Sequence, residues 1–248
     1  MTDEAVAAVV AIAAVAAVRE QVALSCRILG ALGQGDLVWG HVAARDPLGR
    51  GAWIKASGWG LEEITPERVH LVDRNGKVIE GEGRRHLEYP IHLEILAARP
   101  DVMAVVHTHP SSAMALAATG QPLRPVSHDA TYFGPDGVAR FDATSELIRN
   151  QHLGKDLAAA LGRRRGVILA RHGIVTVGPD VPMATLGAIF LERGSETQLR
   201  AAAAGLVDWS SDAELEAKRQ GVFTPEQVHV AWAYLARTAG SRPVPDCA

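Results

Sequence analysis

The chain has 248 residues, of which 48% are hydrophobic and 21% are charged, and its formal net charge is -3. This composition is that of an ordinary globular protein, and the length suits one large α/β domain over residues 1–248. No basic patch stands out, so we expect no nucleic-acid partner. Cys26 and Cys247 lie near opposite ends of the chain, which gives no disulfide framework and favours a cytoplasmic protein.

The first predicted element is an alanine-rich helix over about residues 4–30. Its uncharged run from Ala5 to Val18 follows acidic Asp3 and Glu4, whereas a signal peptide begins with a basic region. The run is also too short to span a bilayer, so we expect no membrane association. We expect the helix to pack against its own domain or against a neighbouring subunit.

Short strands separated by turns follow this helix. Glycine and proline residues mark most of the turns, Asn75-Gly76 predicts a hairpin, and Thr65-Pro66 predicts the start of a very short helix. The strands are expected within residues 35–47, at 53–55, at 69–73 and at 78–79. Connections this short join antiparallel strands, because parallel neighbours need a longer crossover.

Helices and two buried strands make up the rest of the chain. Pro90 opens a helix that must end before Pro100. Apolar runs at 102–106 and 166–170 predict buried strands, and residues 123–141 are expected to be loop-rich with possible short strands. Further helices are predicted at 145–161, 182–204 and 225–237, the last within a C-terminal helical segment of about 205–248. The order of elements predicts a mostly antiparallel or mixed sheet covered by helices.

Three histidines follow the two buried strands. His107 and His109 are spaced by two residues, so their side chains share one face of a strand and can bind one ion. His172 follows the second strand, and Gly173 lets the chain turn behind it. Three imidazoles suit zinc or another first-row ion and leave a coordination position open for substrate. The alternative is three separate histidines, each satisfied by its own surroundings.

At this point the chain resembles the class II aldolase/adducin family. Four segments carry the resemblance: residues 35–47, 55–73, 82–110 and 171–178. It implies a three-layer fold with a mostly antiparallel sheet, commonly assembled as a homotetramer with active sites between adjacent subunits. It also implies one divalent metal ion per subunit, zinc, manganese or cobalt, bound by His107, His109 and His172. The acidic residue of the family corresponds to Glu88, which is either a ligand or the acid/base.

Departures from the family pattern indicate the substrate. Sugar-phosphate members have Gly-Asn-Ile-Ser, Thr-Pro-Thr-Gly and Ser-Ser-Glu segments that hold a phosphate, and here only Ser57 and Gly58 of that set persist. Without the other hydroxyl donors, a phosphorylated substrate is disfavoured. Arg84, Arg85, His86 and His41 stand in their place, and arginine suits planar carboxylates. Arg84 is interpreted as a solvated loop residue.

This pattern is similar to family members that decarboxylate hydroxylated aromatic dicarboxylates such as 3,4-dihydroxyphthalate. The metal would stabilise an enolate-like carbanion as carbon dioxide leaves, and a positioned acid would then protonate the ring carbon. Candidates for the acid are Glu88, His128 and Asp129. The predicted substrate-binding residues of this small-molecule enzyme are His41, Ser57, Gly58, Arg85, His86 and Tyr132.

Two other functions fit the same residues. One is an aldolase or epimerase acting on an unphosphorylated, carboxylated substrate, and the other is a non-catalytic, adducin-like scaffold that binds no metal. His92 lies four residues after Glu88 and could share its side of a helix. We interpret His92 as a partly buried helix residue.

Overall fold

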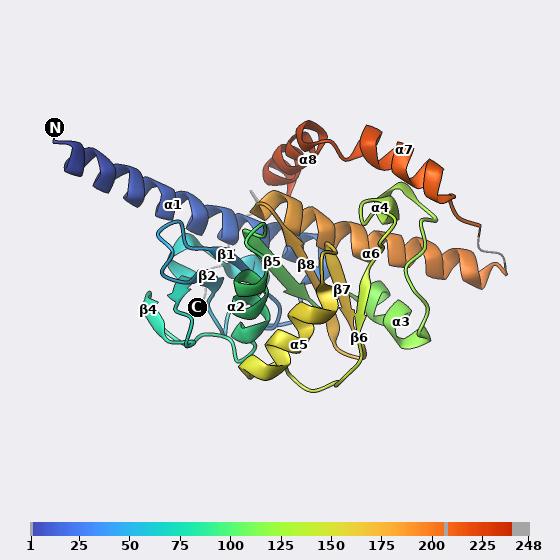
Figure 1. Cartoon of the computed structure of the whole chain (residues 1–248), viewed down its shortest axis with the longest axis horizontal. Coiled ribbons are helices and arrows are strands. Elements are labelled where there is room, and N and C mark those ends of the chain that lie inside the picture. Colours follow the sequence, from blue (N-terminus) through green and yellow to red (C-terminus); the bar gives the residue numbers. More distant parts are fainter. Residues whose placement is uncertain (1, 206–207, 240–248) are drawn as a thin grey trace.

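The computed structural model describes residues 2–205 and 208–239 and is centred on one sheet (Figure 1). Within these residues the strand order is β4-β3-β2-β1-β5-β8-β7-β6. Neighbouring strands are antiparallel except β6 and β7, so the predicted mostly antiparallel sheet is confirmed. The strands are β1 (His41–Arg45), β2 (Ala52–Lys55), β3 (Val69–Val72), β4 (Val78–Glu80), β5 (Ala104–Thr108), β6 (Ala139–Phe141), β7 (Gly166–Leu169) and β8 (Gly173–Gly178).

Helices cover both faces of the sheet. They are α1 (Asp3–Leu29), α2 (Tyr89–Ala98), α3 (Ser111–Thr119), α4 (His128–Thr131), α5 (Gln151–Leu161), α6 (Val181–Ala203), α7 (Asp212–Val222) and α8 (Pro225–Thr238), with short turns at Gly30–Gln34, Leu61–Glu63 and Pro66–Arg68. α1 and α6 pack on one face, and α2 and α5 pack on the other. Successive strand residues alternate between the two cores, as Val105 and Val106 do, because side chains alternate across a strand.

The N-terminal part of α1 projects from the body of the molecule (Figure 1). The helix is mostly buried from Val22 to Leu29, whereas Val9, Val10 and Ile12 are exposed. In the described chain, the segment Ala5–Gln34 is long and apolar enough to cross a membrane by length and composition alone, with a mean hydropathy of 1.8. The expectation that the run is too short to span a bilayer is therefore wrong, since the helix continues beyond Val18.

Two other expectations needed correction. The helix predicted to begin at residue 145 begins at Gln151, because the side chain of Asn150 caps it by accepting the backbone N–H of Leu153. The loop-rich region expected at 123–141 contains the short strand β6, as predicted, but also the unpredicted helix α4. α3 likewise has no counterpart among the predicted helices. The predicted C-terminal helical segment corresponds to α7 and α8, and Cys247 lies outside the described residues.

Candidate metal centre and its cavity

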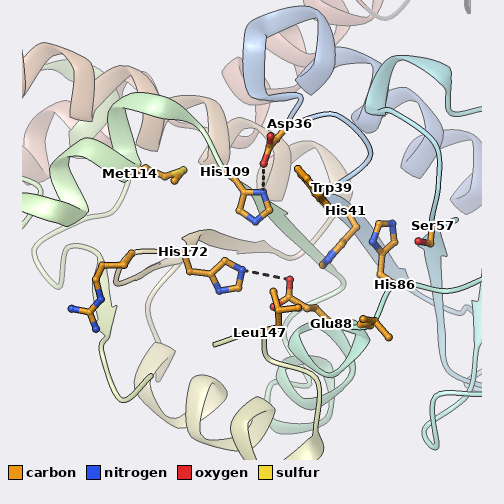
Figure 2. A pocket seen from close by; sticks show the side chains of 13 residues that line it. Asp36, Trp39, His41, Ser57, His86, Glu88, His109, Met114, Leu147 and His172 are labelled. Carbon is orange, nitrogen blue, oxygen red and sulfur yellow. Dashed lines mark hydrogen bonds and ion pairs between the residues drawn. The ribbon is translucent and has the colours of Figure 1, made fainter. Parts of the chain in front are cut away.

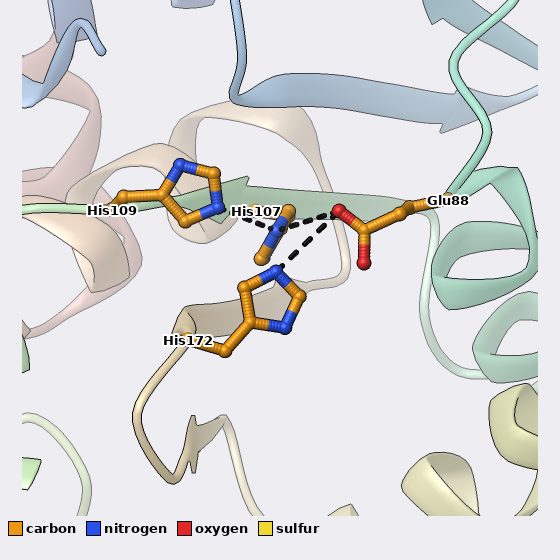
Figure 3. A group of neighbouring side chains, drawn as sticks. All are labelled: Glu88, His107, His109 and His172. Carbon is orange, nitrogen blue, oxygen red and sulfur yellow. Dashed lines mark hydrogen bonds and ion pairs between the residues drawn. The ribbon is translucent and has the colours of Figure 1, made fainter. Parts of the chain in front are cut away.

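Sheet topology brings the predicted metal ligands together. β5 pairs with β8, placing Thr108 opposite Ile174, so His107 and His109 near the end of β5 meet His172, which directly precedes β8. Glu88 approaches from the start of α2. The ligand atoms of these four residues all lie within 4.8 Å of one another. Figure 3 shows the four side chains gathered around one point.

The hydrogen bonds of the histidines leave lone pairs facing the cluster. Nδ1–H of His107 donates to the carbonyl oxygen of Ile174 at 2.9 Å, and Nδ1–H of His109 donates to Oδ2 of Asp36 at 3.1 Å. Each Nε2 is then unprotonated, although the two Nε2 atoms are only 3.1 Å apart. Nε2 of His172 is buried without a hydrogen-bond partner. Lone pairs in this arrangement repel one another unless a cation lies among them, so the residues fit a divalent metal.

Glu88 completes the cluster as a carboxylate. Its Oε1 accepts the backbone N–H of Ile148 at 2.8 Å, and its Oε2 lies 3.7 Å from Nε2 of His107 and 3.5 Å from Nε2 of His172. The bond to Ile148 fixes Oε1, so Oε2 faces the imidazoles of His107 and His172. The geometry therefore favours a metal ligand over a proton donor at this position.

Burial favours the neutral form of His109, which is the form that binds a metal ion. It lowers the pKa of His109 to about 3, and neighbouring His107 and His172 contribute in the same direction.

Gly173 serves close packing rather than a turn. A Cβ atom at this position would lie 2.6 Å from the Thr108 carbonyl oxygen and 2.6 Å from Cδ2 of His109. The unusual backbone is at Arg171, which has a φ of 62°. Left-handed conformations of non-glycine residues are often found at functional sites.

A cavity of about 370 Å³ opens over the metal ligands (Figure 2). Of the predicted substrate-binding residues, His41, Ser57 and His86 line it. Sequence reasoning missed most of its wall, which includes Trp39, Leu87, Met114, Leu147 and Arg171. These residues come from separate loops and α3, so no local pattern in the sequence marked them.

A buried lysine stands behind the cavity wall. Nζ of Lys55 lies 3.3 Å from Nε2 of His86 and donates to the carbonyl oxygens of Val38 and Ala56. Burial lowers the pKa of Lys55 to about 8. The pKa of His86 is lowered to about 3, mainly by burial and secondly by the positive charge of Lys55. Lys55 therefore places a cation next to a neutral cavity histidine.

Arg85 and Tyr132 point elsewhere in this chain. Arg85 donates to the backbone oxygen of Gly76 and lies over the ring of Tyr89, with Cζ 4.0 Å from its centroid, and it does not line the cavity. Tyr132 is fully buried, and its hydroxyl donates to the backbone oxygen of Met183. Its prediction as a cavity hydroxyl is wrong, because the chain folds it into the hydrophobic core.

Three further predicted residues do not line the cavity. His128 and Asp129 lie in α4, where Asp129 pairs with Arg193 at 3.4 Å, and burial raises the pKa of Asp129. Gly58 follows Ser57 at a turn with a φ of 89° and is absent from the cavity wall. Neither His128 nor Asp129 is thus a proton donor for the cavity of its own chain.

Comparison with known proteins identifies the family. The family model described as Class II Aldolase and Adducin N-terminal domain matches residues 20–199. A 3,4-dihydroxyphthalate decarboxylase of Terrabacter sp. (strain DBF63) is 34% identical over 202 residues, which cover 77% of this chain and 83% of that protein. An L-fuculose 1-phosphate aldolase from Glaciozyma antarctica PI12 superposes with a TM-score of 0.80 at 26% identity, covering 91% of this chain and 90% of that one.

A second solved structure agrees with this assignment. An aldolase II superfamily protein from Pseudomonas syringae has a TM-score of 0.81 at 27% identity, covering 90% of this chain and 92% of that chain. The chain therefore belongs to the class II aldolase/adducin family. It is a lyase of that superfamily with a site of three histidines and one glutamate suited to a metal ion.

Proposed function

We propose that the chain is a divalent-metal-dependent decarboxylase of a hydroxylated aromatic dicarboxylate such as 3,4-dihydroxyphthalate. The observation that carries the proposal is the character of the cavity wall. Trp39, Leu87, Met114 and Leu147 are exposed apolar side chains that all line the cavity. Exposed apolar surface gathered in a concave site fits an apolar ligand body. A flat aromatic ring matches this wall better than a sugar does.

Polar groups in the same cavity suit the substituents of such a ring. Arg171 lies in the wall and offers the fork of donors that a carboxylate accepts. His41 and His86 line the opposite side of the cavity from His172 (Figure 2). Nζ of Lys55 lies 3.3 Å from Nε2 of His86. The cationic role that the sequence suggested for Arg85 thus passes to Arg171 and Lys55.

Decarboxylation breaks the bond between the ring and one carboxylate, leaves the electron pair on the ring carbon and replaces carbon dioxide by a proton. A divalent ion bound by Glu88, His107, His109 and His172 would supply a Lewis acid for the charge that develops on the substrate oxygens. Ile148 and Asp36 keep the ligand side chains in place through their hydrogen bonds to Glu88 and His109.

Carbon dioxide release tests the proposal. Purified chain loaded with zinc, manganese or cobalt is incubated with 3,4-dihydroxyphthalate, and carbon dioxide and the dihydroxybenzoate product are measured. Phthalate, which lacks the hydroxyl groups, and a His172→Gln variant are the controls, and neither is expected to give product. Absence of carbon dioxide with all three metals would refute the decarboxylase.

The aldolase alternative draws support from the structural similarity to an L-fuculose 1-phosphate aldolase. It predicts aldehyde release from an unphosphorylated hydroxy-keto acid and no carbon dioxide from the aromatic substrate. The same incubation therefore separates the two reactions.

We also propose a cytoplasmic homo-oligomer. The exposed apolar residues Val9, Val10 and Ile12 on α1 support a contact between subunits. Light scattering of the purified chain tests the oligomeric state, and a monomer would contradict the proposed subunit contact.

A further inference from the structure

His92 is a fully buried histidine that none of the roles described above uses. It lies on α2, and its Nε2 is 2.6 Å from Nδ1 of His41 in the cavity wall. Nδ1 of His92 is buried without a hydrogen-bond partner. A buried polar atom left unpaired costs free energy, so the short bond to His41 carries the polar interactions of this ring.

The unpaired atom determines which ring donates the proton. Each neutral imidazole has one N–H donor and one acceptor nitrogen. If Nδ1–H of His41 donated, His92 would bury an unpaired N–H, whereas if Nε2–H of His92 donates, only an unpaired acceptor is buried. Buried unpaired N–H groups are the rarer of the two in proteins. The proton therefore lies on Nε2 of His92.

The cavity-facing nitrogen of His41 follows from this choice. With Nδ1 of His41 accepting from His92, its remaining proton must lie on Nε2. No described residue hydrogen bonds to that atom, and His41 points into the cavity in Figure 2. The ring lies beside His107 and His86, with centroids 4.9 Å and 4.4 Å away. Its free N–H is thus next to the place where a substrate bound at the metal ligands would lie.

We infer that His92 is a positioning residue that fixes His41 as the Nε2–H tautomer, so that His41 donates a hydrogen bond to a substrate carboxylate or hydroxylate oxygen. The identity of that oxygen rests on the proposed function, whereas the tautomer does not. A donor at this position complements an anionic substrate, and an acceptor would repel it.

The tautomer is measured directly by long-range ¹H–¹⁵N correlation spectroscopy of the ¹⁵N-labelled, zinc-loaded chain. The His41 signals are assigned by their loss in a His41→Asn variant. We expect the Nε2–H tautomer in the wild type and in His92→Gln, whose amide can still donate, and a mixture of tautomers in His92→Leu. An Nδ1–H tautomer in the wild type would overturn the inference even if His92→Leu failed to fold.

Kinetics test the consequence for substrate. With 3,4-dihydroxyphthalate, His92→Leu should raise KM roughly ten- to a hundredfold, the effect of one lost hydrogen bond to a charged group, while kcat changes little. His92→Gln, whose amide can still donate to His41, should keep KM close to the wild-type value. His70→Leu is the matched control, since His70 is also buried with an unpaired Nδ1 but, unlike His92, makes no hydrogen bond to a residue of the cavity wall. It should lower stability without changing KM.

The outcomes separate this inference from the proposed function. An altered tautomer with an unchanged KM would overturn the role toward substrate, and an unaltered tautomer in His92→Leu would overturn the positioning role. Absence of any turnover of the aromatic substrate would refute the decarboxylase, and the tautomer of His41 would still decide the role of His92.

Discussion

Replacing Gly173 by alanine should disturb both the fold and the metal ligands. The added methyl would lie 2.6 Å from the Thr108 carbonyl oxygen and 2.6 Å from Cδ2 of His109, closer than side-chain carbons approach other atoms in proteins. The carbonyl cannot move easily, because Thr108 belongs to the β5 strand paired with β8. Forcing such a contact into a packed site costs about 1–3 kcal/mol.

The second effect of Gly173→Ala is on metal affinity. If the Thr108 carbonyl does not move, the imidazole ring of His109 must. His109 then loses its position relative to Asp36 and His107. We expect metal affinity to fall at least roughly tenfold, the lower end of the losses seen when the support of a ligand is changed. Urea unfolding of the metal-free chain measures the first effect, and competition with a chromogenic chelator measures the second.

Gly221→Ala is the matched control. Gly221 lies in α7, and an added Cβ there meets no heavy atom within 4 Å. This variant should be as stable as the wild type or up to about 1 kcal/mol more stable, with unchanged metal affinity. If Gly173→Ala matched the wild type in both assays, the close packing behind the metal ligands would be refuted.

Three further predictions follow from the cavity. Asp36→Ala should weaken metal binding roughly ten- to a hundredfold in the chelator assay, because Asp36 orients His109; unchanged affinity would contradict this. Burial lowers the pKa of His86 to about 3 from 6.5, so only the unfolded chain takes up this proton between these pH values. The metal-free protein should therefore lose stability as pH falls from 6.5 towards 3, by up to about 1.4 kcal/mol per pH unit for this residue, and urea unfolding of His86→Asn should show a shallower slope. Arg171→Gln should raise KM for 3,4-dihydroxyphthalate about tenfold or more, whereas Arg85→Gln should not; the reverse result would restore the first assignment of Arg85.

His107 and His109 were predictable as a pair because their geometry is local, whereas His172 joins them through the pairing of β5 with β8. Two histidines spaced by two residues at the end of a buried strand share a face whatever the rest of the fold does. The family resemblance supplied Glu88, and the structure added that its carboxylate is held by the backbone of Ile148. The strands were also predictable, since turns and apolar runs mark their ends.

The residues of the cavity wall could not be predicted in the same way. Arg85 and His86 are neighbours in sequence, yet Tyr89 and Gly76 hold Arg85 away from the cavity while His86 lines it. The direction of each side chain depends on partners that the sequence pattern does not reveal. The sequence predicted a partly buried His92, whereas the structure buries it fully. Its bond to His41 forms only when α2 packs against the sheet, which no local pattern reveals.

Metal analysis of the purified chain tests the central claim most directly. After incubation with zinc, manganese or cobalt and removal of free ions, plasma mass spectrometry should find about one ion per wild-type chain, as one site of this ligand set predicts, and the same in Gly221→Ala. His172→Gln, which removes the buried unpaired Nε2, should lose that ion. A wild-type chain that retains none of the three metals, or a His172→Gln chain that retains its ion at full occupancy, would contradict a metal site formed by Glu88, His107, His109 and His172.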